Sequence, residues 1–229
     1  MLLAAGRGER MRPLTDQVPK PLLEAGGKAL IIWHIEKLVR AGMTELVINH
    51  AYLGSQIEAA LGDGSKFGAH IQYSAELTAL DTAGGIANAL PLLGKEPFAV
   101  ISSDIYCDYD FACLPDRAAL LKSSEDVAHL LLVDNPPHHA DGDFYLHNGR
   151  IGCNLHLSPN ALALTFSGIS LYKPALFADI TRGSNAPLAP LLRSHLDKIS
   201  GEHFRGQWMD IGTPQRLAEL DQLISRQIS

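Results

Sequence analysis

The chain has 229 residues, of which 46% are hydrophobic and 19% are charged, and its net charge is −6. This length supports one sizeable core, and the acidic balance excludes a broadly basic surface of the kind that binds nucleic acid or an anionic membrane. No apolar run approaches the roughly 20 residues of a membrane-spanning helix, and no secretory signal is visible. The three cysteines are odd in number and lack metal-ligand spacing, so we expect a cytoplasmic protein in which they are reduced and at least half-buried: Cys107, Cys113 and Cys153.

The chain begins with a short apolar run, 1–5, which predicts a buried strand that ends at Gly6 and Gly8. Because this strand is short for a central one, we expect the natural protein to begin a few residues earlier. Glycine lets the backbone adopt positive φ and approach a ligand closely. Four cations follow within reach of this turn, the last of them between two prolines: Arg7, Arg10, Arg12 and Lys20. Free backbone N–H groups ringed by cations favour a polyphosphate, so the pattern predicts a nucleoside triphosphate site.

Strand and helix patterns then alternate through the first two thirds of the chain. Apolar runs predict strands at 45–49, 70–76, 97–105 and 128–134. Helical spacing of apolar residues predicts helices at 30–41, 55–61 and 85–93. Alternation of this kind with short connections is typical of an α/β fold. We therefore expect a Rossmann-like, mostly parallel central sheet with helices on both faces.

The last third has a different pattern, which is richer in strands. It predicts a hairpin from 143–148 and 151–157, a strand at 162–172, a helix at 186–199, a strand at 203–209 and a closing helix at 214–227. We therefore expect a small β-rich lobe beside the main sheet. No repeat or linker interrupts the chain, which predicts a single domain, 1–229, divided near residue 125 into two halves.

Two aspartates stand at the ends of predicted strands. Asp104 follows the apolar run that begins at Phe98, and Asp210 follows Trp208 and precedes Gly212. In an open α/β sheet, ligands bind beyond the carboxyl ends of the strands, so both carboxylates are expected to face one crevice. Two carboxylates with phosphate and water oxygens form the hard-oxygen set that Mg²⁺ prefers. Taken alone, each aspartate is equally compatible with capping a helix N-terminus.

Residues 3–22 can be compared with the known phosphate-binding motifs. The dinucleotide fingerprint requires glycine where this chain has Met11, and the Walker A pattern is absent. Residues 3–15, Leu-Ala-Ala-Gly-Arg-Gly-Glu-Arg-Met-Arg-Pro-Leu-Thr, with Pro-Lys-Pro-Leu at 19–22, resemble the signature of the sugar-1-phosphate nucleotidyltransferase family. Residues 208–213, Trp-Met-Asp-Ile-Gly-Thr, resemble the second metal-binding segment of that family. A strand-to-helix turn with ordinary surface arginines is the structural alternative, and it leaves Pro-Lys-Pro unexplained.

The resemblance implies transfer of a nucleotidyl group from a nucleoside triphosphate to a sugar 1-phosphate, with release of pyrophosphate. It implies catalytic roles for Arg10 on the β- and γ-phosphates and for Lys20 on the α-phosphate. Asp104 and Asp210 are implied as catalytic ligands of Mg²⁺. The nucleotide-binding residues that it implies are Leu3, Ala4, Ala5, Gly6, Gly8, Glu9, Arg10, Lys20, Thr82, Gly84 and Gly85. Residues 1–125 would form the nucleotide-binding half, and residues 126–229 the sugar-binding half.

A second glycine segment, 80–85, resembles the nucleobase-binding loop of the family. Asp81 stands where the family commonly has glycine, which leaves the identity of the base open. A simple helix N-terminus is the alternative interpretation of the same residues. We expect Glu76 to assist in holding this loop.

The acceptor site is implied by the resemblance alone. Its expected residues are Gly142, Asp143, Ser167, Gly168 and Arg205. The usual Glu-Lys-Pro of the family before the strand at 162–172 is missing, and residues 154–159 stand in its place. His138, His139 and His203 lack zinc-ligand spacing, so we interpret them as solvated loop residues.

Over its whole length the chain resembles one compact branch of the family, which acts in bacterial cell-wall recycling. The stretches that carry this resemblance include 47–51, 61–65, 133–136, 142–144 and 201–203. The branch implies UTP as the donor and N-acetylmuramate α-1-phosphate, a lactyl-bearing amino sugar phosphate, as the acceptor. A mannose-1-phosphate guanylyltransferase or a glucose-1-phosphate nucleotidyltransferase is the alternative within the family. A non-catalytic nucleotide-binding regulator is the alternative outside it. We expect a monomer or small homo-oligomer without nucleic-acid or membrane partners.

Overall fold

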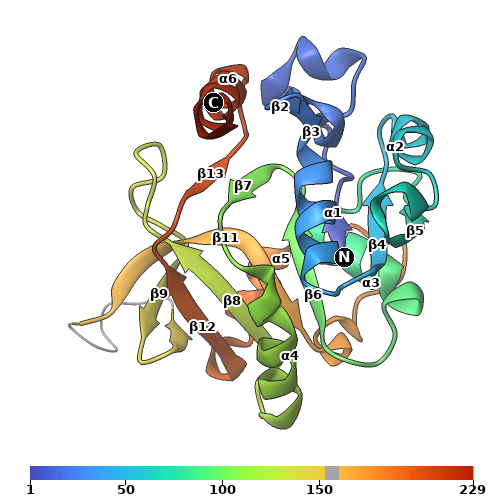
Figure 1. Cartoon of the computed structure of the whole chain (residues 1–229). Helices are drawn as coiled ribbons and strands as arrows, with labels where there is room; N and C mark the ends of the chain where they lie inside the picture. Colours follow the sequence, from blue (N-terminus) through green and yellow to red (C-terminus); the bar gives the residue numbers. More distant parts are fainter. Residues whose placement is uncertain (153–159, 229) are drawn as a thin grey trace.

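A nine-stranded sheet runs through the computed structural model, which describes residues 1–152 and 160–228 (Figure 1). In spatial order its strands are β5 (His70–Ala75), β4 (Glu45–His50), β1 (Leu2–Leu3), β6 (Phe98–Ser102), β11 (Leu162–Tyr172), β8 (Ala128–Val133), β12 (Ile199–Phe204), β10 (Arg150–Gly152) and β9 (Phe144–His147). The first four strands are parallel to one another. Their carboxyl ends therefore meet at one edge of the sheet, where a ligand site is expected.

The prediction of a mostly parallel Rossmann-like sheet is wrong, because the sheet is mixed. Strand β11 runs antiparallel to all three strands that it pairs with, β6, β8 and β9. Strands β9 and β10 form an antiparallel hairpin. A parallel connection requires a crossover of a dozen or more residues, usually a helix. The described part of the chain between β8 and β11 contains no α-helix, so β11 returns in the opposite direction.

Helices cover both faces of the sheet, as the alternating pattern predicts. Helices α1 (Leu30–Arg40) and α4 (Leu114–Ser123) lie in front of it in Figure 1, whereas α3 (Asp81–Leu93) and α5 (Leu188–Arg193) pack on the other face. Successive side chains of a strand point to opposite faces. Leu130 and Leu132 of β8 accordingly join the core beneath α3 and α5, and Leu131 joins the core beneath α1, α4 and α2 (Gly54–Leu61).

The closing helix returns to the beginning of the chain. Helix α6 (Pro214–Ile228) packs on the small hairpin of β2 (Glu24–Ala25) and β3 (Lys28–Ala29). Ile211, Leu220 and Ile224 form a third core with residues of this N-terminal segment. Just before α6, β13 (Trp208–Asp210) pairs with β7 (Ile105–Cys107) in a separate two-stranded ribbon. This ribbon ties the end of the chain to the residues that follow β6.

Several predicted boundaries are wrong. The helix expected at 186–199 ends at Arg193, and β12 begins at Ile199. The apolar residues Leu196 and Ile199 therefore belong to a short 3-10 helix and to a strand. The strand expected at 203–209 is divided between β12 and β13, which lie in different sheets. The strand expected at 97–105 ends at Ser102, before the separate strand β7.

Other predictions agree closely with the structure. Strand β11 has the predicted bounds, and α1, α2, β4, β5 and β8 lie within a residue of theirs. The hairpin is confirmed as β9 and β10, although residues 153–159 lie outside the described residues. Helix α4 and the β2–β3 hairpin were not predicted, because the apolar periodicity of these segments is weak.

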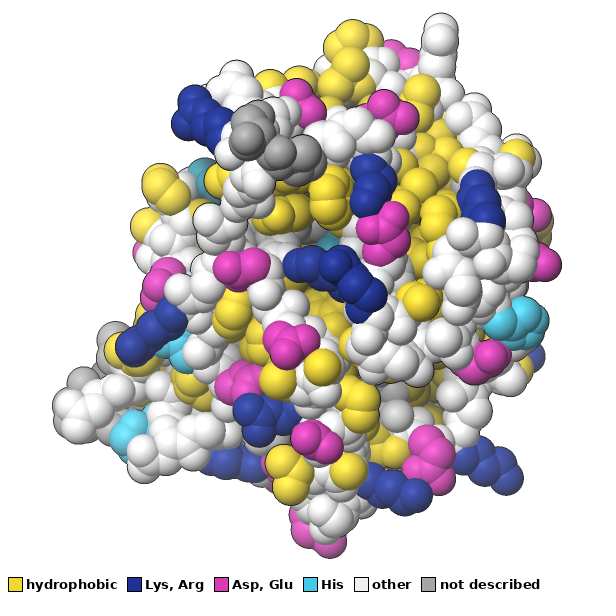
Figure 2. Space-filling view, in the orientation of Figure 1, with side chains coloured by type: hydrophobic (Ala, Val, Ile, Leu, Met, Phe, Trp, Pro, Cys, Tyr) yellow, Lys and Arg dark blue, Asp and Glu magenta, His cyan; other side chains and the backbone are white. Residues whose placement is uncertain are grey.

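The surface shows no dominant charge on the face drawn in Figure 2, where Lys and Arg side chains are interspersed with Asp and Glu. None of the described helices is long and apolar enough to cross a membrane. Cys107 is buried, whereas Cys113 is exposed, which corrects the prediction for that residue. Cys153 lies outside the described residues.

Candidate active site

Two adjoining cavities open at the carboxyl ends of β1 and β6. The small cavity measures about 260 Å³ and is lined by Leu3, Ala4, Ala5, Gly6, Lys20, Pro21, Asn49, Ala79, Asp81, Thr82, Ser102, Ser103 and Asp104. The large cavity, of about 620 Å³, extends from Arg10 and Asp210 to helix α5. The two cavities share four lining residues: Leu3, Asp81, Thr82 and Ser102. The predicted nucleotide segment and the predicted acceptor segment therefore face neighbouring spaces.

The N-terminal turn is built around Gly8, whose φ of 67° favours glycine. A Cβ at this position would lie 3.0 Å from the Thr15 side chain and 3.2 Å from Cβ of Lys20. The Thr15 hydroxyl also donates a hydrogen bond to the Gly8 carbonyl, at 2.8 Å. Gly8 and the exposed Glu9 line neither cavity, so their nucleotide contacts stay predictions.

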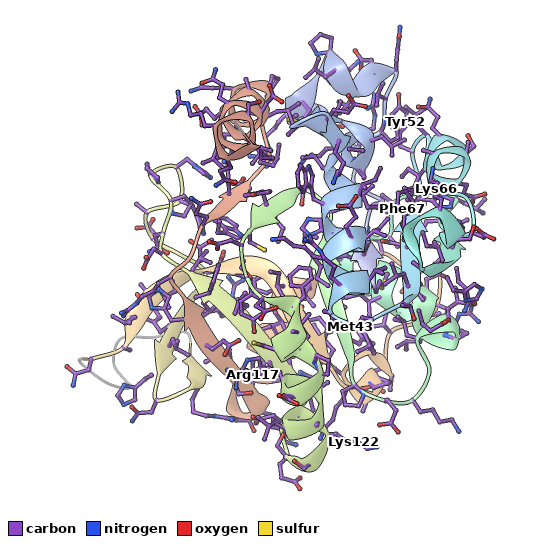
Figure 3. All side chains as sticks on the ribbon, viewed as in Figure 1. Met43, Tyr52, Lys66, Phe67, Arg117 and Lys122 are labelled. Carbon is purple, nitrogen blue, oxygen red and sulfur yellow. The ribbon has the colours of Figure 1, made fainter. Side chains whose placement is uncertain are left out.

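The four cations of this segment have different surroundings. Arg12 pairs with Asp16 at 2.7 Å, and Arg7 donates to the Thr15 carbonyl and lies over the ring of Tyr52, which Figure 3 labels. Arg10 lines the large cavity and makes no hydrogen bond or ion pair with any described residue. Arg10 therefore has its guanidinium available for an anionic ligand.

Lys20 is held against Asp104. Its ammonium Nζ lies 2.5 Å from Asp104 Oδ2, and its side chain is only 10% exposed. Burying an ammonium group is costly unless a partner compensates it, and the Asp104 carboxylate provides that partner. Because both residues line the small cavity, the pair presents one cation and one carboxylate to any ligand bound there.

The ribbon of β7 and β13 brings the two predicted aspartates together. The backbone N–H of Ile211 donates to the Asp104 carbonyl at 2.7 Å, and Asp210 stands opposite Ile105 in the ladder. Asp210 Oδ1 accepts a hydrogen bond from Arg216 at 2.7 Å and lies 3.0 Å from Nε2 of His138. Neither partner is predicted from the sequence, because Arg216 belongs to no motif and the context of His138 indicates a solvated loop residue.

The two aspartates could hold a divalent cation with help from a ligand. Asp104 uses Oδ2 for Lys20, and Asp210 uses Oδ1 for Arg216 and His138. The second oxygen of each carboxylate accepts no hydrogen bond from a described residue. No cluster of three or more His, Cys, Asp or Glu side chains that could hold a metal occurs among the described residues. Such a site fits Mg²⁺, which commonly takes one or two carboxylates and completes its shell with phosphate and water.

A buried chain of hydrogen bonds holds the loop before α3. The Leu80 N–H donates to Glu76 Oε2 at 2.9 Å, and the Asn49 side-chain amide donates to Glu76 Oε1 at 2.7 Å. The Ala4 N–H in turn donates to Asn49 Oδ1 at 3.0 Å. The expectation that Glu76 holds this loop is confirmed, and Asn49 is a further residue of the site that the sequence analysis did not identify.

Only part of the segment at 80–85 faces the cavities. Thr82 lines both cavities, as does Asp81, whose φ of 62° explains why glycine is the common residue there. Gly84 and Gly85 are buried in α3 and line neither cavity. A Cβ on Gly84 would lie 2.4 Å from the Ser184 carbonyl, and one on Gly85 would lie 2.7 Å from Glu76. Close packing thus accounts for both glycines, and their contact with nucleotide stays a prediction.

The large cavity contains three of the five predicted acceptor residues, namely Asp143, Ser167 and Gly168. Asp143 Oδ2 accepts the Phe166 N–H at 2.8 Å, which fixes its carboxylate at the cavity wall. Gly142 lies behind the wall, where a Cβ would meet the Leu164 carbonyl at 2.8 Å. Arg205 is exposed, contacts His203 and lines neither cavity, so the structure does not bring it to the predicted site. The missing Glu-Lys-Pro at 154–159 lies outside the described residues.

Fold and site together define an α/β protein with an anion-binding cleft at the carboxyl ends of its parallel strands. The cleft contains Arg10, which has no partner among the described residues, the Lys20–Asp104 pair and Asp210. These charged groups are suited to transfer chemistry at a phosphate group.

Comparison with known proteins agrees with this class. Residues 1–141 match the Nucleotidyl transferase family. The chain is 51% identical to N-acetylmuramate alpha-1-phosphate uridylyltransferase from Neisseria meningitidis serogroup B, over 97% of this chain and 96% of the relative. It is 33% identical to the protein of the same name from Caulobacter vibrioides, over 94% and 92%. In structure it resembles a putative glucose-1-phosphate thymidylyltransferase from Bacillus anthracis, with a TM-score of 0.83, 21% identity and coverage of 97% and 93%. The chain therefore belongs to the nucleotidyl transferase family, as a sugar-1-phosphate nucleotidyltransferase.

Proposed function

We propose that this enzyme transfers UMP from UTP to N-acetylmuramate α-1-phosphate, and that it does so in the cytoplasm as a step of peptidoglycan recycling. The observation that carries the proposal is the 51% identity to the Neisseria meningitidis uridylyltransferase, which extends over nearly the whole of both chains. The proposed acceptor half is thus included in the similarity, and not merely the phosphate-binding segment.

The reaction is an in-line displacement at phosphorus. A phosphate oxygen of the sugar 1-phosphate attacks the α-phosphorus of UTP, the bond to the bridging oxygen breaks, and pyrophosphate leaves with the electron pair. A phosphate monoester dianion is already a nucleophile, so the reaction needs no general base. Catalysis then consists of positioning and charge neutralisation.

The proposed roles of the cations follow from their surroundings. Arg10, which has no partner among the described residues, binds the β- and γ-phosphates and the departing pyrophosphate. Lys20 binds the α-phosphate and the incoming phosphate oxygen at the edge of the small cavity. Asp104 and Asp210 would hold Mg²⁺, which would supply positive charge that neutralises the phosphates.

A pyrophosphate-release screen tests the proposal. It crosses UTP, dTTP, GTP and CTP with the 1-phosphates of N-acetylmuramate, N-acetylglucosamine, glucose and mannose. We expect UTP with N-acetylmuramate α-1-phosphate to give the highest kcat/KM. A higher value for GTP with mannose 1-phosphate would favour the guanylyltransferase alternative. Nucleotide binding without turnover of any pair would favour the non-catalytic regulator.

The metal assignment has its own test. Asp104→Asn and Asp210→Asn should each lower turnover at saturating Mg²⁺ by about a hundredfold or more, because each removes a carboxylate charge from the ion. Calorimetry should also show weaker Mg²⁺-dependent nucleotide binding. Asp108→Asn is the control, because Asp108 lies on the same part of the chain but lines neither cavity. Near-normal rates in either active-site variant would contradict the assignment.

A further inference from the structure

Helix α5 lines part of the large cavity. Leu188 and Leu192 of this helix line the cavity together with the exposed Arg193 in its last turn. Helix α5 packs against α3, which begins at the nucleotide loop. The part of the cavity wall that α5 supplies is therefore apolar, with one cation beside it.

Arg193 has no partner among the residues that the structure describes. It makes no hydrogen bond, ion pair or ring contact with a described residue. The other arginine that lines this cavity is Arg10, which belongs to the N-terminal turn and whose guanidinium approaches Gly212 next to Asp210. Arg10 is already assigned to pyrophosphate. Arg193 is therefore available to bind a different anionic group of the substrates.

Arg193 and the two leucines of α5 define what this part of the cavity can hold. An exposed guanidinium next to two apolar side chains fits an anionic group carried on a short aliphatic stem. Tyr172 also lines the large cavity, but its hydroxyl is fully buried, so a ligand in the cavity does not reach that group.

The charges of the cavity explain why a cation is needed there. Three aspartates also line it: Asp81, Asp143 and Asp210. A ligand that brings a carboxylate in addition to its phosphate would be repelled by these side chains unless a cation stood beside it. A neutral sugar has no such requirement.

We propose that Arg193 is the specificity-determining residue for the acceptor, and that its guanidinium binds the lactyl carboxylate of N-acetylmuramate α-1-phosphate. Leu188 and Leu192 contact the methyl group of the lactyl ether. The inference rests on the proposed function for the identity of the acceptor. It replaces Arg205, which the sequence suggested and which lines neither cavity.

The test is a chemical double-mutant cycle on the full chain. Arg193→Gln and wild type are compared on three acceptors, with UTP as donor. They are N-acetylmuramate α-1-phosphate, its analogue in which the lactyl carboxylate is replaced by a neutral amide, and N-acetylglucosamine α-1-phosphate. We expect Arg193→Gln to lower kcat/KM for the muramate by at least about tenfold, as expected for loss of a charge-assisted hydrogen bond. The variant should match wild type on the other two acceptors, and Arg193→Lys should restore part of the loss. Activity on the two acceptors that lack the lactyl carboxylate also shows that the variant is folded.

Two further variants complete the design. Arg182→Gln is the matched control, because Arg182 is also exposed on the segment before α5 but lines neither cavity. Arg205→Gln tests the competing assignment. Equal losses on all three acceptors, no loss at all, or a muramate-selective loss in Arg205→Gln would overturn the role of Arg193. If wild type itself does not prefer the muramate, the proposed function fails, and this inference fails with it.

Discussion

Lys20 combines burial with a role that requires charge. The residue is only 8% exposed, and its neighbours Pro19 and Pro21 restrict the backbone on either side. Its Nζ lies 2.5 Å from Asp104 Oδ2. A cation held in this way is positioned before the substrate binds. In the proposed mechanism it would therefore stabilise developing charge on phosphate without further reorganisation.

Lys20→Ala is accordingly expected to lower kcat by about a hundredfold or more, with a smaller change in the affinity for UTP, because its charge acts mainly in the transition state. Steady-state kinetics and nucleotide binding measured by calorimetry separate the two effects. Lys28→Ala is the control, since Lys28 forms a similar ion pair with Glu36 outside both cavities. If binding is lost while turnover of the bound nucleotide is unchanged, Lys20 is an anchor for the ground state.

Among the elements, β1, β4 and the loop before α3 behave as one unit. Glu76 accepts hydrogen bonds from Asn49 of β4 and from the Leu80 N–H, and Asn49 accepts one from Ala4 after β1. The chain is buried, with Glu76 7% exposed and Asn49 3% exposed. Three segments distant in sequence therefore hold the floor of the small cavity in one geometry.

Glu76→Gln should destabilise this unit, because the new amide group cannot accept both hydrogen bonds. One buried donor is then left unsatisfied, at a cost of about 1–3 kcal/mol. Denaturant unfolding should show this loss, and KM for UTP should rise because the loop at 80–82 is less well held. Glu45→Gln, which removes an exposed ion pair with His70, should change stability by less than about 1 kcal/mol. Equal stability of the two variants would refute the role given to Glu76.

At the scale of the whole molecule, a charged cluster joins α4 to the second half of the sheet. Glu202 of β12 accepts hydrogen bonds from the Tyr109 hydroxyl at 2.7 Å and from Arg117 of α4, labelled in Figure 3, at 2.5 Å. Burial by itself would raise the pKa of Glu202, but His129, Tyr109 and Arg117 together lower it to about 2. Elsewhere, burial lowers the pKa of His34 to about 4, against the effect of its hydrogen bond to the Ile105 carbonyl.

Both shifts predict loss of stability in acid. The unfolded chain protonates His34 near its ordinary pKa of 6.5 and Glu202 near 4.5, whereas the folded chain protonates them near 4 and 2. The unfolded state therefore binds more protons from about pH 6.5 downwards, and the free energy of unfolding falls with pH. Urea unfolding from pH 7 to pH 3 should show this fall. Glu202→Gln should be less stable at pH 7 and should lose less between pH 5 and pH 3, whereas Glu45→Gln should follow wild type. An unchanged slope in Glu202→Gln would rule out its contribution.

The sequence by itself was sufficient for features that depend on local patterns. Apolar periodicity located α1, β4 and β11. The glycine turn and Lys20 between prolines predicted a polyphosphate site, and the structure places Gly6 and Lys20 in the lining of one cavity. Such features are predictable because strand and helix periods and glycine turns are encoded within a few neighbouring residues.

The tertiary structure decided everything that depends on segments far apart in the chain. The antiparallel placement of β11 depends on which strands are neighbours, which no local period encodes. Asp210 meets Arg216 and His138 because β13 pairs with β7, and this pairing also brings Asp210 beside Asp104. Arg205 and Arg193 are both exposed arginines near strand or helix ends, and their sequence contexts do not tell which one lines the large cavity. Packing of α5 against α3 places Arg193 there, because the position of a side chain in a cavity is a property of the assembled elements.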